Sequence, residues 1–322
     1  MAEDLARRGV LVTSVFAPRV LRAQSWPSQP IRMVVPYAPG GTTDLVARLV
    51  AAPLAERLGV AVTIENRPGA GATVGSLQVA QATPDGHTLV MSNIASHGIA
   101  PALYANIRYD AVRDFSHIAL ITQNPSVFVA NPRSGIASLA QLAARHAASP
   151  GGIDMASSGA GSSNHLLIVL MGRLLGREIN HIPFRGAGPA MTAVIGGQVP
   201  LMSDSLPSAA SHLRAGSVLG IAISGEARHP AFPDIPTFRE QGHDVVSTSW
   251  FGLSGPAGMP AMVVERLNRE VRDILSGAEL GRRFAELGGT PGRLTASEYT
   301  DYVRREVEYW APLVRASGAQ PD

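Results

Sequence analysis

The sequence predicts an α/β fold in which a mostly parallel sheet is flanked by helices. Short apolar runs of strand length alternate with segments whose apolar residues recur at helical spacing, a pattern typical of such a sheet. Apolar residues make up 45% of the 322 residues and charged residues 16%, so the chain can bury a sizeable core. The length favours two domains, and 33 glycines with 24 prolines indicate many turns.

Strands are expected wherever a short buried run is bounded by turn residues. The first such run, Ile31–Val35, follows a proline-rich segment. Two later runs, Phe115–Ile121 and Val127–Ala130, should form separate extended segments because Asn124-Pro125 divides them. The other predicted strands are Val60–Ile64, Thr88–Met91, Ile153–Ala156, His181–Pro183, Val199–Met202 and Val218–Ile223.

Helices are expected between these strands. The clearest one carries apolar residues at helical spacing from Leu45 to Leu58 and should end at Gly59. In the last third, Pro260 is expected at the first position of a helix. The segment Thr295–Glu298 has the pattern of a capping box before another helix. These late helices are expected to pack on the existing sheet rather than to form a new domain.

The chain contains neither cysteine nor lysine, so all 27 basic residues are arginine. The missing lysine excludes a Walker A phosphate loop and a pyridoxal Schiff base. The missing cysteine excludes a thiolate zinc site, a cysteine nucleophile and disulfides. We therefore expect no cofactor and no metal.

The first 23 residues have the features of an export signal. The adjacent arginines Arg7 and Arg8 precede a short apolar run, and small residues at Ala23 mark a cleavage end, which favours the twin-arginine route. The alternative is an amphipathic terminus. Residues 1–23 carry a net charge of +2, which is the formal charge of the whole chain. The mature protein is therefore neutral, which argues against nucleic-acid binding, and we expect it to be periplasmic.

Three glycine-rich loops each connect a predicted strand to a predicted helix. They cover residues 36–44, 157–163 and 184–189. Ligands in open α/β sheets bind at the carboxyl ends of strands, and a helix start offers free N–H groups and the positive end of its dipole to an anion. The helix after the second loop starts without an acidic residue, whereas Asp44 can neutralise the first. For each loop alone, a plain turn with a helix cap remains the simpler interpretation.

Catalytic motifs are missing from the sequence. Neither G-x-S-x-G nor H-E-x-x-H occurs, and the nine histidines lack metal-ligand spacing. Ser162 and His165 are one helical turn apart, and Asp204 follows a later strand. A serine hydrolase would need the fold to bring these three together, so a polar helix cap is the favoured interpretation.

Several segments together resemble the Bug family of periplasmic solute receptors, the binding subunits of tripartite tricarboxylate transporters. The resemblance runs in order from Trp26 to the end of the chain, and each segment is weak alone. Three departures are Ala38 and Thr42, where relatives vary, and Ser205, where asparagine is common. The matching segments are Trp26–Arg32, Val35–Gly41, Glu65–Gly71, Thr83–Gly86, Ser158–His165, Pro183–Ala190, Ile195–Val199, Asp204–Ala209 and Ser249–Gly252.

The resemblance implies a two-lobed periplasmic-binding-protein fold of type II, which closes on a small carboxylate. Lobe one would comprise residues 26–123 and 250–322, and lobe two residues 124–249, with crossings at Asn124-Pro125 and Thr248–Gly252. The first two loops would clamp the carboxylate, and Asp204 would help select the other end of the ligand. The implied ligand-binding residues are Tyr37, Ala38, Gly40, Gly41, Thr42, Asn93, Ser158, Gly161, Ser162, Ser163, Arg185 and Asp204.

The resemblance leaves the ligand open among di- and tricarboxylates, amino acids and aromatic acids. It implies a monomer that delivers its ligand to membrane permease subunits. An orphan receptor that feeds a sensor protein, and an enzyme built on the same anion cleft, are the alternatives. Arg185 either faces the anion or makes a solvated surface contact, which is worth about 0–1 kcal/mol.

The twin-arginine interpretation predicts that Arg7 and Arg8 are needed for export. Changing both to glutamine should leave the precursor in the cytoplasm, because the route depends on the arginine pair. Cell fractionation followed by immunoblotting measures this. Normal periplasmic delivery of the double variant would rule out this route, although not export by the general pathway.

Overall fold

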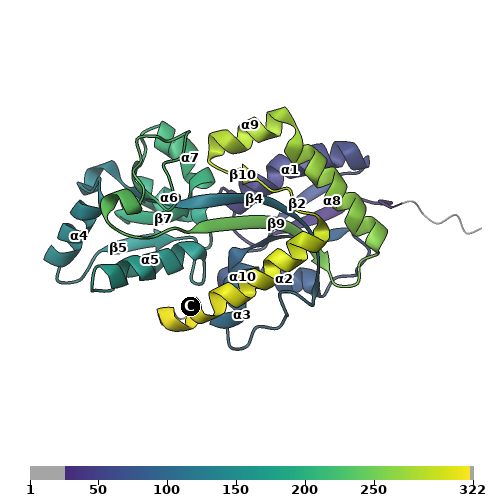
Figure 1. Ribbon diagram of the computed structural model, residues 1–322, viewed down its shortest axis with the longest axis horizontal. Helices are drawn as coiled ribbons and strands as arrows, with labels where there is room; N and C mark the ends of the chain where they lie inside the picture. Colours follow the sequence, from purple (N-terminus) through teal and green to yellow (C-terminus); the bar gives the residue numbers. More distant parts are fainter. Residues whose placement is uncertain (1–25, 320–322) are drawn as a thin grey trace, which may run out of the picture.

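The computed structural model describes residues 26–319, so the predicted export signal lies outside the described residues. The fold is a two-lobed α/β structure. The first lobe is built on strands β1, β2 and β3, and the second on β5, β6, β7 and β8. In Figure 1 the long strands β4 and β9 lie between the two groups of helices and connect them. The predicted fold class is therefore correct at the level of its two lobes.

Parallel pairing holds within each lobe: β1 pairs with β2 and β3, and β5 pairs with β6 and β7. The strands that connect the lobes are antiparallel to their neighbours, so the sheet is mixed. The strands are β1 Ile31–Val35, β2 Val62–Asn66, β3 Thr88–Asn93, β4 Phe115–Ala130, β5 Asp154–Ser157, β6 Asn180–Pro183, β7 Leu201–Ser205, β8 Leu219–Ile223, β9 Thr248–Pro256 and β10 Thr290–Pro291.

Strand β4 is continuous over 16 residues, so the expected division at Asn124-Pro125 was wrong. Residues 115–125 of β4 pair with β9, and residues 126–130 pair with β7 and β8. Pro125 stands where the pairing partners change, opposite Thr248, the first residue of β9. A proline lacks a backbone donor, but this loss is tolerated at such a margin. One strand thus belongs to both lobes.

The helices follow the expected alternation. Gly59, with φ of 71°, ends α1, and the capping box at Thr295 starts α10, both as predicted. Pro260 is the N-cap of α8 rather than its first helical residue. The helices are α1 Thr42–Leu58, α2 Thr73–Ala80, α3 Ala100–Leu103, α4 Leu139–Ala148, α5 Ser163–Leu174, α6 Ala187–Ile195, α7 Leu206–Arg214, α8 Ala261–Ser276, α9 Ala278–Leu287 and α10 Ala296–Ser317. Shorter turns are η1 Ala70–Ala72, π-helical η2 Ala95–Ile99, η3 Pro132–Ser134 and η4 Arg239–Gln241.

Each lobe buries both faces of its sheet. Alternate residues of a strand point to opposite faces. In the first lobe Met33 therefore joins the core beneath α1 and α8, while Val34 joins a core with α2. In the second lobe Val129 packs with α6 and α7, while Phe128 packs with α4 and α5. The helices thus hold the carboxyl ends of the strands at the junction between the lobes.

Among residues 26–319, no helix is both long and apolar enough to cross a membrane.

The capping box predicts a measurable contribution to stability. Thr295 Oγ1 accepts the Glu298 N–H, and Glu298 Oε2 accepts the Thr295 N–H. Thr295→Ala should destabilise the protein by about 1 kcal/mol, because it leaves helix-start donors without their cap. The midpoint of urea unfolding checks this, with Ser297→Ala as the control. Equal midpoints for both variants would contradict the role of the cap.

Candidate functional site

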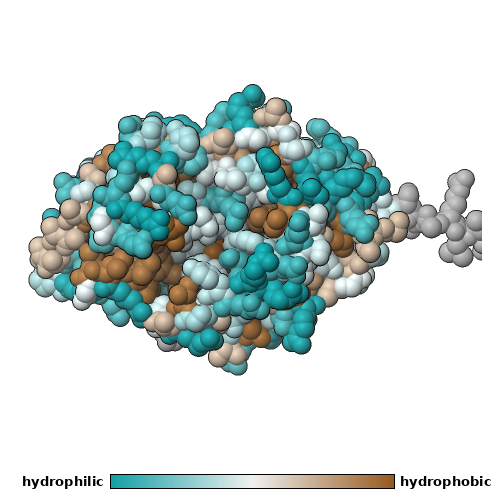
Figure 2. Space-filling model, viewed as in Figure 1, coloured by the Kyte–Doolittle hydropathy of each residue, from teal (hydrophilic) through white to brown (hydrophobic). Residues whose placement is uncertain are grey.

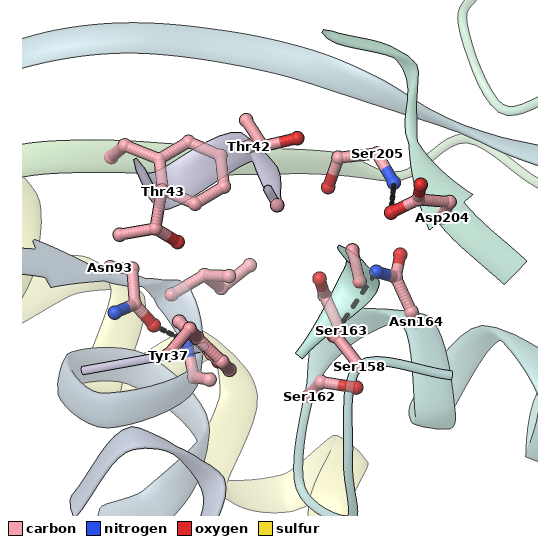
Figure 3. A pocket seen from close by; sticks show the side chains of 15 residues that line it. Tyr37, Thr42, Thr43, Asn93, Ser158, Ser162, Ser163, Asn164, Asp204 and Ser205 are labelled. Atoms are coloured by element: carbon pink, nitrogen blue, oxygen red, sulfur yellow. Dashed lines mark hydrogen bonds between the residues drawn. The ribbon is translucent and has the colours of Figure 1, made fainter. Parts of the chain in front are cut away.

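A small polar cavity lies at the junction of the lobes (Figure 3). Its volume is about 30 Å³. Figure 3 shows side chains of the first lobe, including Thr42 and Asn93, on one side and side chains of the second lobe, including Ser163 and Asp204, on the other. The residues that line it are Tyr37, Gly41, Thr42, Thr43, Asn93, Ile94, Ala95, Ser158, Ser162, Ser163, Asn164, Ala187, Asp204, Ser205 and Phe251.

Several helices begin at this cavity. Its walls include the first residues of α1, α5 and α6, and the N-cap residue of α7. The first N–H groups of a helix have no partner within the helix. The N-cap residues of α1, α6 and α7 make no side-chain cap, although Thr42 Oγ1 accepts the Ser208 N–H in the first turn of α7. Ser162 caps α5 by accepting the His165 N–H. Unspent donors and positive dipole ends therefore converge on one point, an arrangement that favours an anion.

Two backbone donors expected to face the ligand have partners within the chain instead. The Gly40 N–H donates to Asp44 Oδ2 at 3.1 Å, and the Gly161 N–H donates to His165 Nδ1 at 3.1 Å. Both glycines have positive φ, 88° for Gly40 and 72° for Gly161, which favours glycine and turns these N–H groups towards their own helices. These glycines therefore shape the loops, and the donors near the cavity come from the residues that follow them.

Asp204 is the one carboxyl group in the cavity lining. Its side chain is 1% exposed. Oδ1 accepts the Ser205 N–H at 2.8 Å and Oδ2 accepts the Ser208 hydroxyl at 2.7 Å. Burial raises the pKa of Asp204 to about 7, against the two hydrogen bonds, which lower it.

The network of Asp204 reaches the other lobe through Thr42. Thr42 Oγ1 donates to Ser208 Oγ at 2.9 Å and accepts the Ser208 N–H at 3.2 Å. A second link joins the loops, since the Ala38 N–H donates to the Arg185 carbonyl at 3.0 Å. These bonds hold the two lobes together directly at the cavity.

Among residues 26–319, no arginine and no histidine lines this cavity. Tyr37 is its other titratable residue, and burial raises the pKa of that hydroxyl above its usual range. Within residues 26–319 no three histidine, aspartate or glutamate side chains are grouped as metal ligands. The site therefore offers an anion only neutral donors: backbone N–H groups, hydroxyls and amides.

Eight of the twelve residues expected from the resemblance line the cavity, and four do not. Ala38, Gly40 and Gly161 belong to the loops around it. The Arg185 side chain is exposed, outside the cavity lining, and only its carbonyl takes part in the contact between loops. The eight that line it are Tyr37, Gly41, Thr42, Asn93, Ser158, Ser162, Ser163 and Asp204.

The structure adds lining residues that the sequence reasoning left out. Asn164 is the second residue of α5 and Ala187 the first of α6, so both belong to helix starts after loops that the sequence had already indicated. Ile94 and Ala95 follow β3, whose carboxyl end reaches the same edge of the sheet. Thr43, Ser205 and Phe251 complete this group.

The three residues considered for a hydrolase triad have other partners. Ser162 Oγ donates to the Gly159 carbonyl at 2.7 Å and accepts the His165 N–H at 3.1 Å. The His165 ring stacks on His181 with centroids 3.9 Å apart. Asp204 is bonded to Ser205 and Ser208. Ser162 thus serves as the helix cap that the sequence indicated.

A larger hollow of about 520 Å³ lies between α5 and the last turns of α10. Figure 2 shows apolar atoms gathered over the α5 region. Glu306, an acidic residue in the lining of this hollow, accepts the indole N–H groups of Trp250 and Trp310. The lining of this hollow is mostly apolar, although it includes Arg173, so the helix-start cavity between the lobes is the candidate anion site. The apolar lining includes Leu166, Leu167, Leu170, Tyr309, Trp310 and Leu313.

A two-lobed α/β protein with a polar cavity between its lobes belongs to the class of solute-binding proteins. More particularly, the chain belongs to the tripartite tricarboxylate transporter family receptors, whose family model matches residues 46–319. It is 33% identical over 322 residues to protein BugT of Bordetella pertussis, and the alignment covers 99% of each chain. The family resemblance seen in the sequence is confirmed.

Solved structures of relatives agree with this assignment. MatC from Rhodopseudomonas palustris, solved with bound malate, is 35% identical, has a TM-score of 0.85, and the match covers 90% of this chain and 100% of that one. R. palustris Rpa4515, solved with adipate, is 29% identical with a TM-score of 0.88, and the match covers 92% of this chain and 100% of that one. Malate and adipate are the ligands of those two proteins.

Proposed function

We propose that this receptor captures a small carboxylate between its lobes and delivers it to the membrane permease subunits of a tripartite tricarboxylate transporter. The observation that carries the proposal is the convergence of helix starts on a buried cavity without a basic side chain. Malate and adipate in two similar structures support a dicarboxylate. The receptor works as a periplasmic monomer after removal of a signal near Ala23 and carries out no chemistry on its ligand.

The carboxylate is bound by the donors that the cavity leaves unspent. On one side these are the N–H groups of Thr42 and Thr43 at the start of α1, and on the other those of Ser163 and Asn164 at the start of α5. A hydrogen bond to a charged group contributes about 1.5–3 kcal/mol. Since micromolar affinity needs about 8 kcal/mol in total, two or three such bonds with apolar contact from Ile94 and Phe251 are enough.

Binding requires the lobes to open and close. The cavity of about 30 Å³ is far smaller than the roughly 300–1,000 Å³ of a typical ligand site, so entry separates Thr42 from Ser208. We propose residues 26–123 with 250–322 as one moving lobe and residues 124–249 as the other. The continuous strand β4 and its partner β9 form the connection about which they turn.

The carboxylate is expected to be essential to the ligand. Replacing it by a primary amide removes the charge and directs N–H donors at N–H donors, so affinity should fall about a hundredfold or more. A thermal-shift screen of dicarboxylates, tricarboxylates, amino acids and aromatic acids identifies the ligand, and calorimetry compares it with its amide. Equal affinity for acid and amide would contradict the proposed function.

Closure is expected to depend on Gly188. A Cβ built on Gly188 of α6 would clash with the Pro39 carbonyl of the first loop, across the two lobes. Gly188→Ala should therefore keep the helix but weaken binding at least tenfold, which is about 1.4 kcal/mol. Gly281→Ala in α9, where a Cβ meets open space, is the matched control. Calorimetry measures the affinity of wild type and of both variants for the identified acid. An unchanged affinity of Gly188→Ala would contradict closure through this contact.

A further inference from the structure

The cavity combines two features that conflict unless a proton is present. A ligand carboxylate brings a negative charge into it, and Asp204 already lies there with 1% exposure. Two like charges in a water-poor cavity repel each other, so the pKa of one of them rises strongly unless a cation lies between them. Within the part of the chain that the structure describes, no arginine or histidine lines this cavity, and the sequence has no lysine.

The surroundings of Asp204 offer no hidden cation. Its β4 neighbour is Val127, and α7 and α1 present the hydroxyls of Ser208 and Thr42. The titratable or charged groups on these and adjacent elements have other positions or partners. On α1, Asp44 and Arg48 form an ion pair with each other. On α5, His165 stacks on His181 and accepts the Gly161 N–H. On α7, His212 and Arg214 lie in the last turn, and Tyr37 lines the cavity as a neutral phenol.

The two bonds that Asp204 makes do not replace a cation. Both come from neutral donors, the Ser205 N–H and the Ser208 hydroxyl, and a buried carboxylate needs more than that to stay ionised. Burial already raises the pKa of Asp204 to about 7 before any ligand charge is added. A ligand anion beside it raises that pKa further.

We propose that the receptor binds its carboxylate together with one proton, which Asp204 holds, so that Asp204 donates a hydrogen bond to an acceptor at the far end of the ligand. This inference rests on the proposed function and narrows the ligand to acids whose second polar group is an acceptor, such as dicarboxylates. An ammonium group there would instead need an ionised Asp204 as its partner. At neutral pH the site therefore favours dicarboxylates over amino acids.

Proton uptake accompanies binding in a definite pH range. Above pH 7 the free receptor has lost the Asp204 proton while the complex keeps it, so binding takes one proton from the buffer. The dissociation constant should consequently rise up to about tenfold per pH unit in this range. Below the pKa of Asp204 in the free receptor both states carry the proton, and binding should no longer take up a proton.

The test is calorimetry at pH 8 in two buffers of different ionisation heat, which gives the number of protons taken up on binding. Malate and aspartate are the main probes, because they share a carbon skeleton and differ in having a hydroxyl or an ammonium group. Adipate is the longer diacid. For wild type, uptake close to one proton with malate or adipate, and weaker binding of aspartate, are expected. Asp204→Asn, which cannot ionise, should bind the same diacid without uptake and without the pH dependence. The exposed Asp234→Asn should behave as wild type.

Each other outcome overturns the inference in a recognisable way. Diacid binding without proton uptake, or preferred binding of aspartate, would sink it while leaving the carboxylate receptor intact. Failure of every acid in the screen to bind would remove the proposed function, and this inference with it. Carbon-13 NMR of the receptor's own aspartate side chains, with the Asp204 signal assigned by Asp204→Asn, gives an independent test on the diacid complex: an ionised Asp204 in the complex at neutral pH would also reject the inference.

Discussion

The structure depends on how buried backbone N–H groups at helix starts are satisfied. A buried donor without a partner costs about 1–3 kcal/mol, so most folds cap such groups with side chains. Here the starts of α1 and α6 have glycine N-caps, which supply no side-chain acceptor. Parallel strands bring their carboxyl ends to one edge, so these uncapped starts face the same cavity. A bound anion would supply the acceptor that these helix starts share.

Closing the lobes makes the same donors stronger. In an open cleft, water competes for the N–H groups of α1 and α5, and each bond to an anion is weak. When Thr42 meets Ser208, water is excluded, and electrostatic attraction acts in a medium of lower dielectric constant. The same exclusion penalises the Asp204 carboxylate, since desolvation disfavours its ionised form. One movement therefore strengthens the hold on the ligand and raises the pKa of Asp204.

The sequence indicated part of the cavity lining because glycine-rich loops that follow strands in α/β folds lie at the carboxyl ends of those strands, where ligands bind. Strand β1, the Gly59 end of α1, the Ser162 cap and the Thr295 capping box could all be inferred from local patterns. Local patterns do not report pairing between distant strands. The continuity of β4 through Pro125 was missed because it depends on pairing with distant strands: β4 pairs with β9 up to Pro125 and with β7 from Ser126 onward. The direction of the Gly40 N–H towards Asp44 depends on a positive φ, and the exposure of Arg185 depends on how two loops meet.

Donors made of backbone have a consequence for divergence within the family. A side-chain clamp is lost by one substitution, whereas an N–H group at a helix start persists through almost any change except to proline. Relatives that share about a third of their residues with this chain can thus inherit the anion end of the site with the fold itself. The side chains of the lining, among them Asp204 and Ser205, are the part of the site that substitutions can change. Related receptors can in this way bind different ligands after a few side-chain substitutions, while the backbone hydrogen bonds to the carboxylate are kept.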